Sequence, residues 1–333
     1  MIIKFFRSSF VTQYTVIGLA GSVLWLRTCF DPPPVPLPYG PVPLYELIFS
    51  LIQNLPLLSV VLGFFLVVAE MYWLNQILSG HELVQKNSSL AALIFIMLMS
   101  FYPEALTLNP VSIVVFLLLV IIHNLMISYK KPEHLDRIFA AGFFLSVASM
   151  VYFPFILFSG LIFISFFLFR SGKWRQWVSA ILGLLTPYAY LAVSYFWFDR
   201  FPEKAGAYVD FFMQILVFPN PFRSDFWVLG GMTLFLGIYG LFSHFRGPVE
   251  KTVEIRAKTN LFLWTILLSL LAFFISGPMA IFHPLTAAPA LALVITTALQ
   301  SVKKPAKVEW SLWLWFMMII INTMLFHGMF YQK

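Results

Sequence analysis

The chain has 333 residues, of which 60% are hydrophobic and 11% are charged, and its mean hydropathy is +0.88. This composition lies far outside the range of water-soluble globular proteins and excludes that class. The formal net charge is +7, but in a membrane protein the position of positive charge says more than its total, so no nucleic-acid partner is expected.

The N-terminal segment carries Lys4 and Arg7 ahead of an apolar run, as a signal peptide does. No convincing small-residue cleavage site follows the apolar run, so we expect a retained first helix over 10–26. Further apolar runs long enough to cross the roughly 30 Å hydrocarbon layer recur along the whole chain.

These runs predict the fold class. Every backbone N–H and C=O must be paired inside lipid, and the runs are too long and too uniformly apolar for barrel strands, so the spans are helices. We expect an all-α polytopic transmembrane helix bundle, with residues 1–333 forming a single integral membrane domain. About eleven spans are predicted, at 10–26, 55–77, 89–103, 110–128, 137–152, 154–170, 176–198, 226–245, 260–277, 281–300 and 310–329.

Three of these segments carry helix-breaking signals. The stretch 44–77 holds either one tilted span or, as we favour, an interfacial helix followed by a span that starts at Pro56. The spans 89–103 and 137–152 are shorter than the hydrocarbon layer, and both end in proline turns, FYPE and VYFP. Such helices either open a water-lined cavity or only thin the bilayer.

Two polar breaks are predicted to be external loops with interfacial helices. Residues 27–54 include seven prolines between Pro32 and Pro43, which predicts a stiff extended strap followed by a helix at the interface. Residues 199–225 contain an aromatic and aliphatic run flanked by charges and prolines, which predicts a short helix lying flat in the outer interface.

The placement of the 21 Lys and Arg residues predicts the orientation. When the breaks alternate between two sides, sixteen of these residues fall on one side and five on the other, so the positive-inside rule places the N-terminus in the cytoplasm and the C-terminus outside. The larger group is Lys4, Arg7, Lys86, Lys130, Lys131, Arg137, Arg170, Lys173, Arg175, Arg246, Lys251, Arg256, Lys258, Lys303, Lys304 and Lys307, and the smaller is Arg27, Arg200, Lys204, Arg223 and Lys333.

The external breaks mix acids and bases in a way that suits sugar transfer from a polyprenyl phosphate. Such a reaction needs a carboxylate to take a proton from the acceptor hydroxyl and a cation to hold the phosphate. Asp31 is the candidate catalytic residue, and Arg200, Arg223 and His283 are the candidate substrate-binding residues. The alternative is that the charges only keep the loops solvated and that His283 caps a helix.

Glu70 is the acid closest to the middle of a span, with His123 and Asn124 at a similar depth in the fourth span. An intramembrane carboxylate indicates function by default. The three residues form a structural polar pair or a proton relay, unless Glu70 simply snorkels to the interface.

Several chemistries have no support in the sequence. The single cysteine, Cys29, excludes an internal disulfide, and no HxxxH, HExxH or CxxC spacing occurs, so neither a metal nor another cofactor is expected. The chain also lacks GxxxxGK, GxGxxG and nucleophile-elbow motifs, which leaves ATP-driven pumping and dinucleotide chemistry without a basis. Gly230, Gly231, Gly237 and Gly240 are predicted to be close-packing positions between helices.

Four segments carry a resemblance to a known family: MIIKFFRSS, FYPEAL, the run SVASMVYFPFILFSGLIFISFFLFR with KWRQWVSAILGLLTPY after it, and IFHPLTAAPALAL. Together they resemble an uncharacterised family of bacterial multi-spanning inner-membrane proteins, a domain of unknown function. More remotely, the layout is similar to the GT-C class of lipid-linked glycosyltransferases, and this resemblance implies an acid role for Asp31. The paired acid motif of that class is missing, and Phe282 and His283 stand where some members have Arg-Tyr.

We therefore expect a multi-pass protein of the bacterial cytoplasmic (inner) membrane that handles a polyprenyl-linked glycan or envelope intermediate at its external face. Its expected partners are the lipid bilayer and a polyprenyl-phosphate lipid. The alternatives are a membrane transporter, with Glu70 as its first residue to test, and a noncatalytic scaffold or assembly subunit that binds a membrane-protein partner.

Overall fold

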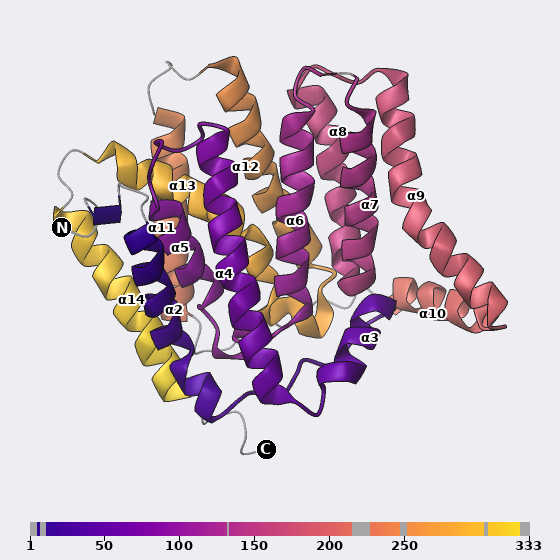
Figure 1. Ribbon diagram of the computed structural model, residues 1–333, viewed down its shortest axis with the longest axis horizontal. Helices are drawn as coiled ribbons and strands as arrows, with labels where there is room; N and C mark the ends of the chain where they lie inside the picture. Colours follow the sequence, from indigo (N-terminus) through magenta and orange to yellow (C-terminus); the bar gives the residue numbers. More distant parts are fainter. Residues whose placement is uncertain are drawn as a thin grey trace.

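The computed structural model describes residues 5–6, 11–131, 133–214, 227–246, 252–302 and 306–326. Over these ranges the ordered elements are thirteen α-helices and short 3-10 helices, and no strand occurs (Figure 1). The all-helical fold class is thereby confirmed. In chain order the elements are α2 (Val11–Phe30), α3 (Pro43–Ile52), α4 (Pro56–Gly80), α5 (Leu90–Met99), η1 (Pro103–Ala105), α6 (Pro110–Ile127), α7 (Leu135–Val151), η2 (Phe153–Phe158), α8 (Ser159–Leu168), α9 (Trp174–Trp197), α10 (Phe201–Gln214), α11 (Trp227–Arg246), α12 (Val253–Phe273), η4 (Gly277–Ile281), η5 (His283–Ala287), α13 (Ala288–Ser301) and α14 (Ala306–Phe326).

Five segments within the described ranges are long and apolar enough to cross a membrane, which indicates a membrane protein. They are α4, α6, α9, α12 and the segment Met279–Ser301, which contains α13. Several other predicted spans correspond to shorter helices, among them α5 with ten residues and α8 with ten residues preceded by η2.

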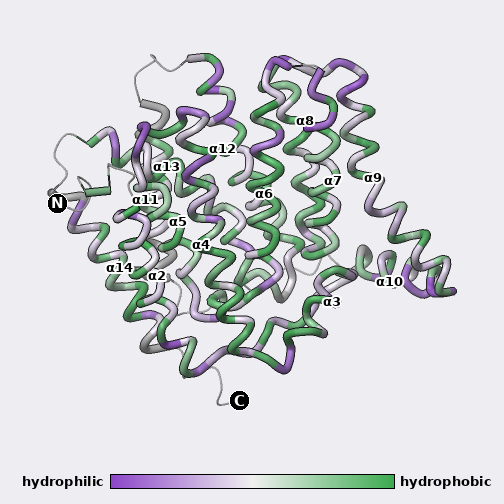
Figure 2. The backbone as a smooth tube through the Cα atoms, in the orientation of Figure 1, coloured by the Kyte–Doolittle hydropathy of each residue, from purple (hydrophilic) through white to green (hydrophobic). Residues whose placement is uncertain are grey.

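The bundle has two distinct ends. Most helices run roughly parallel, and the turns after α6 and α8 lie together at the upper end in Figure 1. We call this the cationic end, because it carries Lys130, Arg170, Lys173 and Arg175. At the opposite end α3 and α10 lie across the bundle direction, and we call it the α3–α10 end. Hydrophilic stretches gather toward the ends and apolar stretches fill the middle (Figure 2).

The helix boundaries follow local sequence signals. Pro56 occupies the first turn of α4, where its missing N–H costs no hydrogen bond, so the predicted joint between α3 and α4 is confirmed. The predicted 260–277 span falls largely in α12, a longer helix that already begins at Val253. Thr252 caps this helix, its hydroxyl accepting a hydrogen bond from the Ile255 N–H at 3.3 Å.

Burial differs sharply between helices. All ten residues of α5 are buried, and 83% of the apolar window that contains α13 is buried. In α9 only 17% of the corresponding window is buried, so most of its apolar side chains face outward. The core therefore lies around α5 and α13, and α9 stands at the periphery.

Helices α7 and α9 pack through small residues and hydroxyl groups. A Cβ atom added at Gly142 would lie 2.7 Å from the Ala180 carbonyl oxygen, and one at Gly183 would meet the Phe139 carbonyl, so both positions require glycine. The Ser146 hydroxyl donates to the Leu184 carbonyl at 2.5 Å. The two backbones are thus in direct contact over several turns.

Helices α11 and α13 also meet at glycines. A Cβ atom at Gly240 would lie 2.6 Å from Val294, and one at Gly237 would lie 3.3 Å from Leu291. The predicted close-packing role is therefore confirmed for these two glycines, and the surroundings of Gly230 and Gly231 lie outside the described side chains.

Candidate functional site at the α3–α10 end

The proline-rich strap, residues 31–42, runs from α2 to α3 without regular structure. It is fixed to α3 because the Tyr45 hydroxyl donates to the Pro36 carbonyl at 2.8 Å. Tyr39 lies against Gly277, whose φ of +53° and close approach to the tyrosine ring exclude a side chain there. The ring of Tyr39 also meets Phe211 of α10, with centroids 5.3 Å apart.

One face of α10 turns toward the strap. Lys204, Tyr208 and Phe211 follow the i, i+4, i+7 spacing of a single helical face. Phe211 is buried and packs edge-on against Phe153 at the start of η2, with centroids 5.2 Å apart. Glu203 and Val209, on other faces, are exposed. This arrangement docks α10 on the bundle and directs Lys204 and Tyr208 inward.

A cavity of about 330 Å³ lies between the strap and α3 on one side and α9 and α10 on the other. Both predicted external loops contribute to its wall. The Lys204 ammonium lies 3.9 Å from a carboxylate oxygen of Glu46, and both side chains are partly exposed. The full set of lining residues is Gly40, Pro41, Pro43, Glu46, Tyr195, Lys204, Ala207, Tyr208, Asp210 and Phe211.

Tyr208 supplies a neutral polar group in this wall that has no hydrogen-bond partner in the described structure. Its hydroxyl oxygen is buried and makes no hydrogen bond. Burial, followed by the nearby Tyr188, Tyr195 and Glu46, raises the pKa of this hydroxyl above its ordinary value. The group therefore stays protonated and is able to donate to, or accept from, a ligand in the cavity.

Together these groups can bind three kinds of chemical group: hydroxyl groups, an anion and an apolar surface. Glu46 and Asp210 offer carboxylates that accept a proton or hydrogen bonds from hydroxyl groups, and Lys204 offers a point charge for an anion. Tyr195 and Tyr208 offer flat faces for an apolar ring. A ligand that matches all three has hydroxyl groups, an anionic group and an apolar surface.

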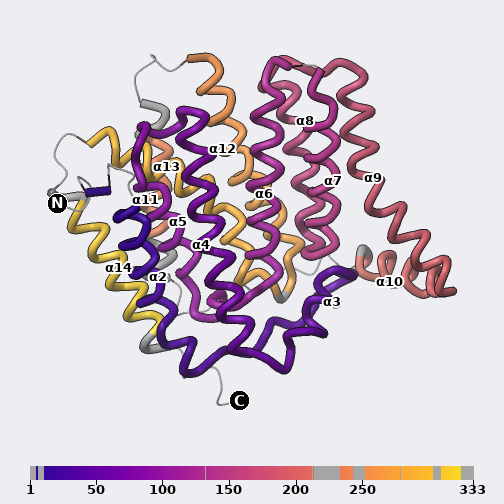
Figure 3. Tube along the Cα trace, in the orientation of Figure 1, coloured from indigo at the N-terminus to yellow at the C-terminus, as the bar shows by residue number. Residues whose placement is uncertain are grey.

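The cavity lies at the foot of α9, which leaves the bundle as it approaches α10 (Figure 3). Pro187 interrupts the backbone ladder of this helix, because proline has no N–H to donate. Beyond Pro187 the side chains of Val193, Phe196 and Trp197 are exposed. The site therefore adjoins an apolar helix surface of the kind that faces lipid.

The charged residues singled out from the sequence do not line this cavity. Asp31 directly follows α2 and is exposed, and Arg200 precedes α10 and is also exposed. Arg223 lies outside the described residues. Their predicted roles stay predictions, while Glu46, Lys204 and Asp210 from the same two loops are the charges that converge.

His283 is buried between helices rather than open to a ligand. Its Nε2 lies 2.8 Å from the Ser269 carbonyl oxygen and its Nδ1 lies 2.7 Å from the Tyr152 hydroxyl. Because a carbonyl only accepts, Nε2 carries the proton and Nδ1 accepts from Tyr152. Both nitrogens are thus used to tie η5 to α12 and to Tyr152, the residue between α7 and η2. The substrate-binding role of His283 stays a prediction.

The pairing expected of Glu70 with His123 and Asn124 does not form. Neither carboxylate oxygen of Glu70 has a hydrogen-bond partner. The Asn124 amide instead donates to the Val120 carbonyl at 2.9 Å and accepts from Arg137 at 3.4 Å. The ring of His123 lies 5.8 Å from that of His81, a residue that sequence reasoning did not single out.

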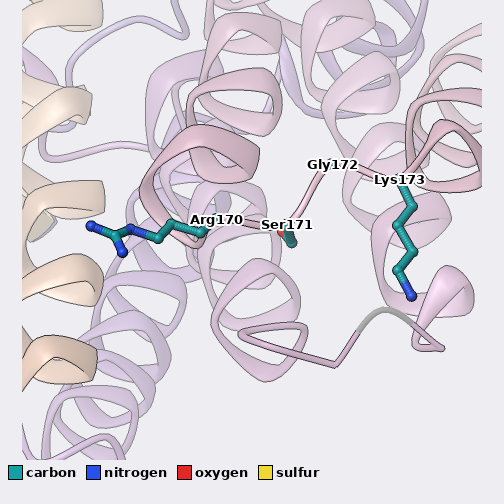
Figure 4. A pocket seen from close by; sticks show the side chains of 4 residues that line it. All are labelled: Arg170, Ser171, Gly172 and Lys173. Atoms are coloured by element: carbon teal, nitrogen blue, oxygen red, sulfur yellow. The ribbon is translucent and has the colours of Figure 1, made fainter.

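Another cavity, of about 410 Å³, opens at the cationic end in the turn between α8 and α9 (Figure 4). Its walls are Arg170, Ser171, Gly172 and Lys173. The side chains of Arg170 and Lys173 point away from each other, so their charges do not converge on one ligand. This cavity lacks the combination of groups found at the α3–α10 end.

Among the described residues, no group of three or more His, Cys, Asp or Glu side chains is placed to hold a metal ion. Comparison of the chain with protein-family models, with curated proteins and with solved structures gives no match. The resemblance to an uncharacterised inner-membrane family and to the GT-C class therefore stays a prediction, and the function is argued from the site.

Proposed function

We propose that the protein is a multi-pass protein of the bacterial inner membrane that handles a polyprenyl-phosphate-linked glycan or related envelope intermediate at the α3–α10 end. The observation that carries this proposal is the convergence of Glu46, Lys204, Asp210 and Tyr208 in one cavity beside the exposed apolar surface of α9. Such an intermediate has the required hydroxyl groups, anionic group and apolar chain. The cavity offers a group for each.

The orientation is part of the proposal: the cationic end is cytoplasmic, the α3–α10 end is external, and about eleven crossings join them. Clustered positive charge supports it. Arg170, Lys173 and Arg175 lie within six residues, in the turn between α8 and α9 and the first turn of α9, at the cationic end. Clustered cations are retained on the cytoplasmic side, because they are costly to translocate.

A chemical step follows from the same groups. Glu46 accepts the proton of an acceptor hydroxyl while the hydroxyl oxygen forms a bond to the anomeric carbon of the lipid-linked sugar. The bond from that carbon to the phosphate oxygen breaks, and the polyprenyl phosphate leaves with the bonding electrons. Lys204 stabilises the negative charge that develops on the phosphate.

The test is complementation of a deletion strain together with mass spectrometry of lipids that copurify in mild detergent. Glu46→Gln and Lys204→Met are expected to lower complementation at least tenfold, since an interaction with a charged group contributes about 1.5–3 kcal/mol. Lys204→Met is also expected to lose the copurifying polyprenyl phosphate. Glu203→Gln, on an exposed face of the same helix, is the matched control and should behave as the unmodified protein.

Full complementation by both cavity variants would reject the catalytic reading and favour a scaffold. Loss of activity in Asp31→Asn with no effect of Glu46→Gln would instead return the catalytic role to Asp31. A reporter fused after α14 that is active only in the cytoplasm would overturn the proposed orientation.

A further inference from the structure

Glu70 is a fully buried acid of the described chain that has no side-chain partner. Its side chain is 0% exposed, and neither oxygen makes a hydrogen bond. The carboxyl group lies beside the backbone of Phe116, whose N–H is already committed to the hydrogen-bond ladder of α6. An ionised carboxylate without a partner is far more costly in such a place than the neutral acid, so Glu70 holds a proton.

A proton fits this site better than a metal ion does. Cations such as Ca²⁺ and Mg²⁺ need several oxygen ligands around them. The surroundings of Glu70 are instead apolar and aromatic: Trp73, one turn further along α4, packs against Phe116 with ring centroids 5.1 Å apart. Among the described residues, no group of three or more His, Cys, Asp or Glu side chains forms around it.

A row of ionisable side chains leads from Glu70 toward the cationic end. On α6, His123 lies seven residues beyond Phe116, or about 10 Å along the helix axis. Its ring lies 6.4 Å from Trp73 and 5.8 Å from His81, and its Nδ1 has no hydrogen-bond partner. We call Glu70, His123 and His81 the α4–α6 row.

The outer end of the α4–α6 row is held by α12. The Lys258 ammonium donates to His81 Nδ1 at 3.0 Å and to Glu254 at 2.5 Å, and the Glu254 side chain is 51% exposed. Since Nδ1 of His81 accepts this bond, the ring is neutral. Burial, with the charge of Lys258 next, lowers the pKa of His81 to about 4, so this ring passes a proton on rather than keeping it.

Between Glu70 and Ser59, toward the α3–α10 end, α4 is closely packed and offers no polar side chain that could carry a proton. A Cβ atom at Gly63 would lie 2.6 Å from the Thr107 backbone, and Ser59 of α4 accepts hydrogen bonds from the Leu108 N–H. Val60 and Val67, on the intervening turns, are buried. The packed backbones leave no polar side chain between Glu70 and Ser59 on the buried part of this helix.

The charged residues on the other neighbours of α4 lie at helix ends, with Arg27 in the last turn of α2 and Glu46 in the first turn of α3. Helix α5 contributes only apolar side chains. From α2, Tyr14 accepts a hydrogen bond from the Asn75 amide at 2.7 Å, away from the α4–α6 row. Arg137 and Lys258 are the cations near the two histidines, with Asp136 and Glu254 as their respective acidic partners.

We propose that Glu70 is a proton-binding site that exchanges its proton with the water at the cationic end through His123 and His81, and with that side alone. This site shares no residue with the cavity at the α3–α10 end. The proposal about Glu70 can therefore be tested independently of the proposed handling of a lipid-linked intermediate. A proton-binding site of this kind would couple the protein to a proton gradient.

The test is infrared spectroscopy of the full-length protein in sealed proteoliposomes of uniform orientation. The unmodified protein is expected to show the C=O stretching band of a buried carboxylic acid at neutral pH, and Glu70→Gln should lack it. Glu104→Gln, in the turn between α5 and α6, is the control that should keep it. An alkaline jump at the cationic end should remove the band at least tenfold faster than the same jump at the other end.

Replacing His81 and His123 together with phenylalanine should slow this removal at least tenfold while leaving the starting band in place. His134→Phe, at the same end but outside the row, should leave the rate unchanged. A band that survives in Glu70→Gln overturns the assignment of the proton, and equal rates from both sides overturn one-sided access. If Glu70→Gln fails to fold, the comparison of alkaline jumps from the two sides of the unmodified protein still tests one-sided access.

Discussion

At the scale of single residues, Lys258 illustrates how a charge is accommodated inside a helix bundle. It is 5% exposed, yet its ammonium has Glu254, His81 and the face of Tyr129, 5.6 Å away, as partners. The first two bonds satisfy two of its three donors, and the ring accepts positive charge through its π electrons. The sequence map placed Lys258 in a polar break just ahead of the predicted span 260–277. Its partner four residues earlier was the available signal, since Glu–Lys pairs at this spacing share one helical face.

The burial of His81 predicts a pH dependence of stability. The pKa of His81 falls from an ordinary value of 6.5 to about 4 in the folded protein, chiefly through burial. As pH drops below about 6.5, the unfolded chain binds the proton first, so the contribution of His81 is present at neutral pH and is lost progressively down to about pH 4. The thermal midpoint in detergent should fall between pH 7.5 and pH 5. The midpoint of His81→Asn should decline less over this pH range than that of the unmodified protein. His134→Asn is the control, and equal declines in the two variants would contradict the assignment.

At the scale of helices, the crossing of α7 and α9 is set by glycines at the point of closest approach. Leucine at Gly183 would have to occupy the space of the Phe139 carbonyl, which is backbone and cannot rotate away. We expect Gly183→Leu to lower the free energy of unfolding by about 1–3 kcal/mol, as overpacking does. The measurement is detergent-based thermal or denaturant unfolding. Gly18→Ala is the control, because nothing lies within 4 Å of a Cβ at Gly18, and equal effects of the two would show that crowding is not the cause.

Helix boundaries were predictable from the sequence where a proline marks them. Pro56 marked the start of α4 because proline fits the first turn, and the proline turns after α5 and α7 were visible in FYPE and VYFP. The convergence of Glu46 with Lys204 was not predictable, since it depends on how α10 packs against the strap. The i, i+4, i+7 spacing of Lys204, Tyr208 and Phe211 was the one hint to the inward face of α10. Asp31, at the other end of the strap, was an equally reasonable choice from the sequence.

At the scale of the whole molecule, the contrast between α9 and α13 separates a lipid-facing surface from the core. The apolar window of α9 is 17% buried and that of Met279–Ser301 is 83% buried. A photoactivated carbene reagent dissolved in the bilayer should label α9 several-fold more than α13, since the reagent partitions into the hydrocarbon region. Peptide mass spectrometry gives the ratio. Protection of α9 that disappears on dilution in detergent would instead point to a protein partner on this surface.

The burial of α5 has a consequence for how the protein is made. At about 15 Å, a helix of ten residues covers only about half of the roughly 30 Å hydrocarbon layer. Its neighbours include α4, synthesised just before it, and α13, which leaves the ribosome roughly two hundred residues later. Residues 90–99 therefore lack their final surroundings during most of translation, and a nascent chain that ends before α13 must shelter them with the translocon or a chaperone.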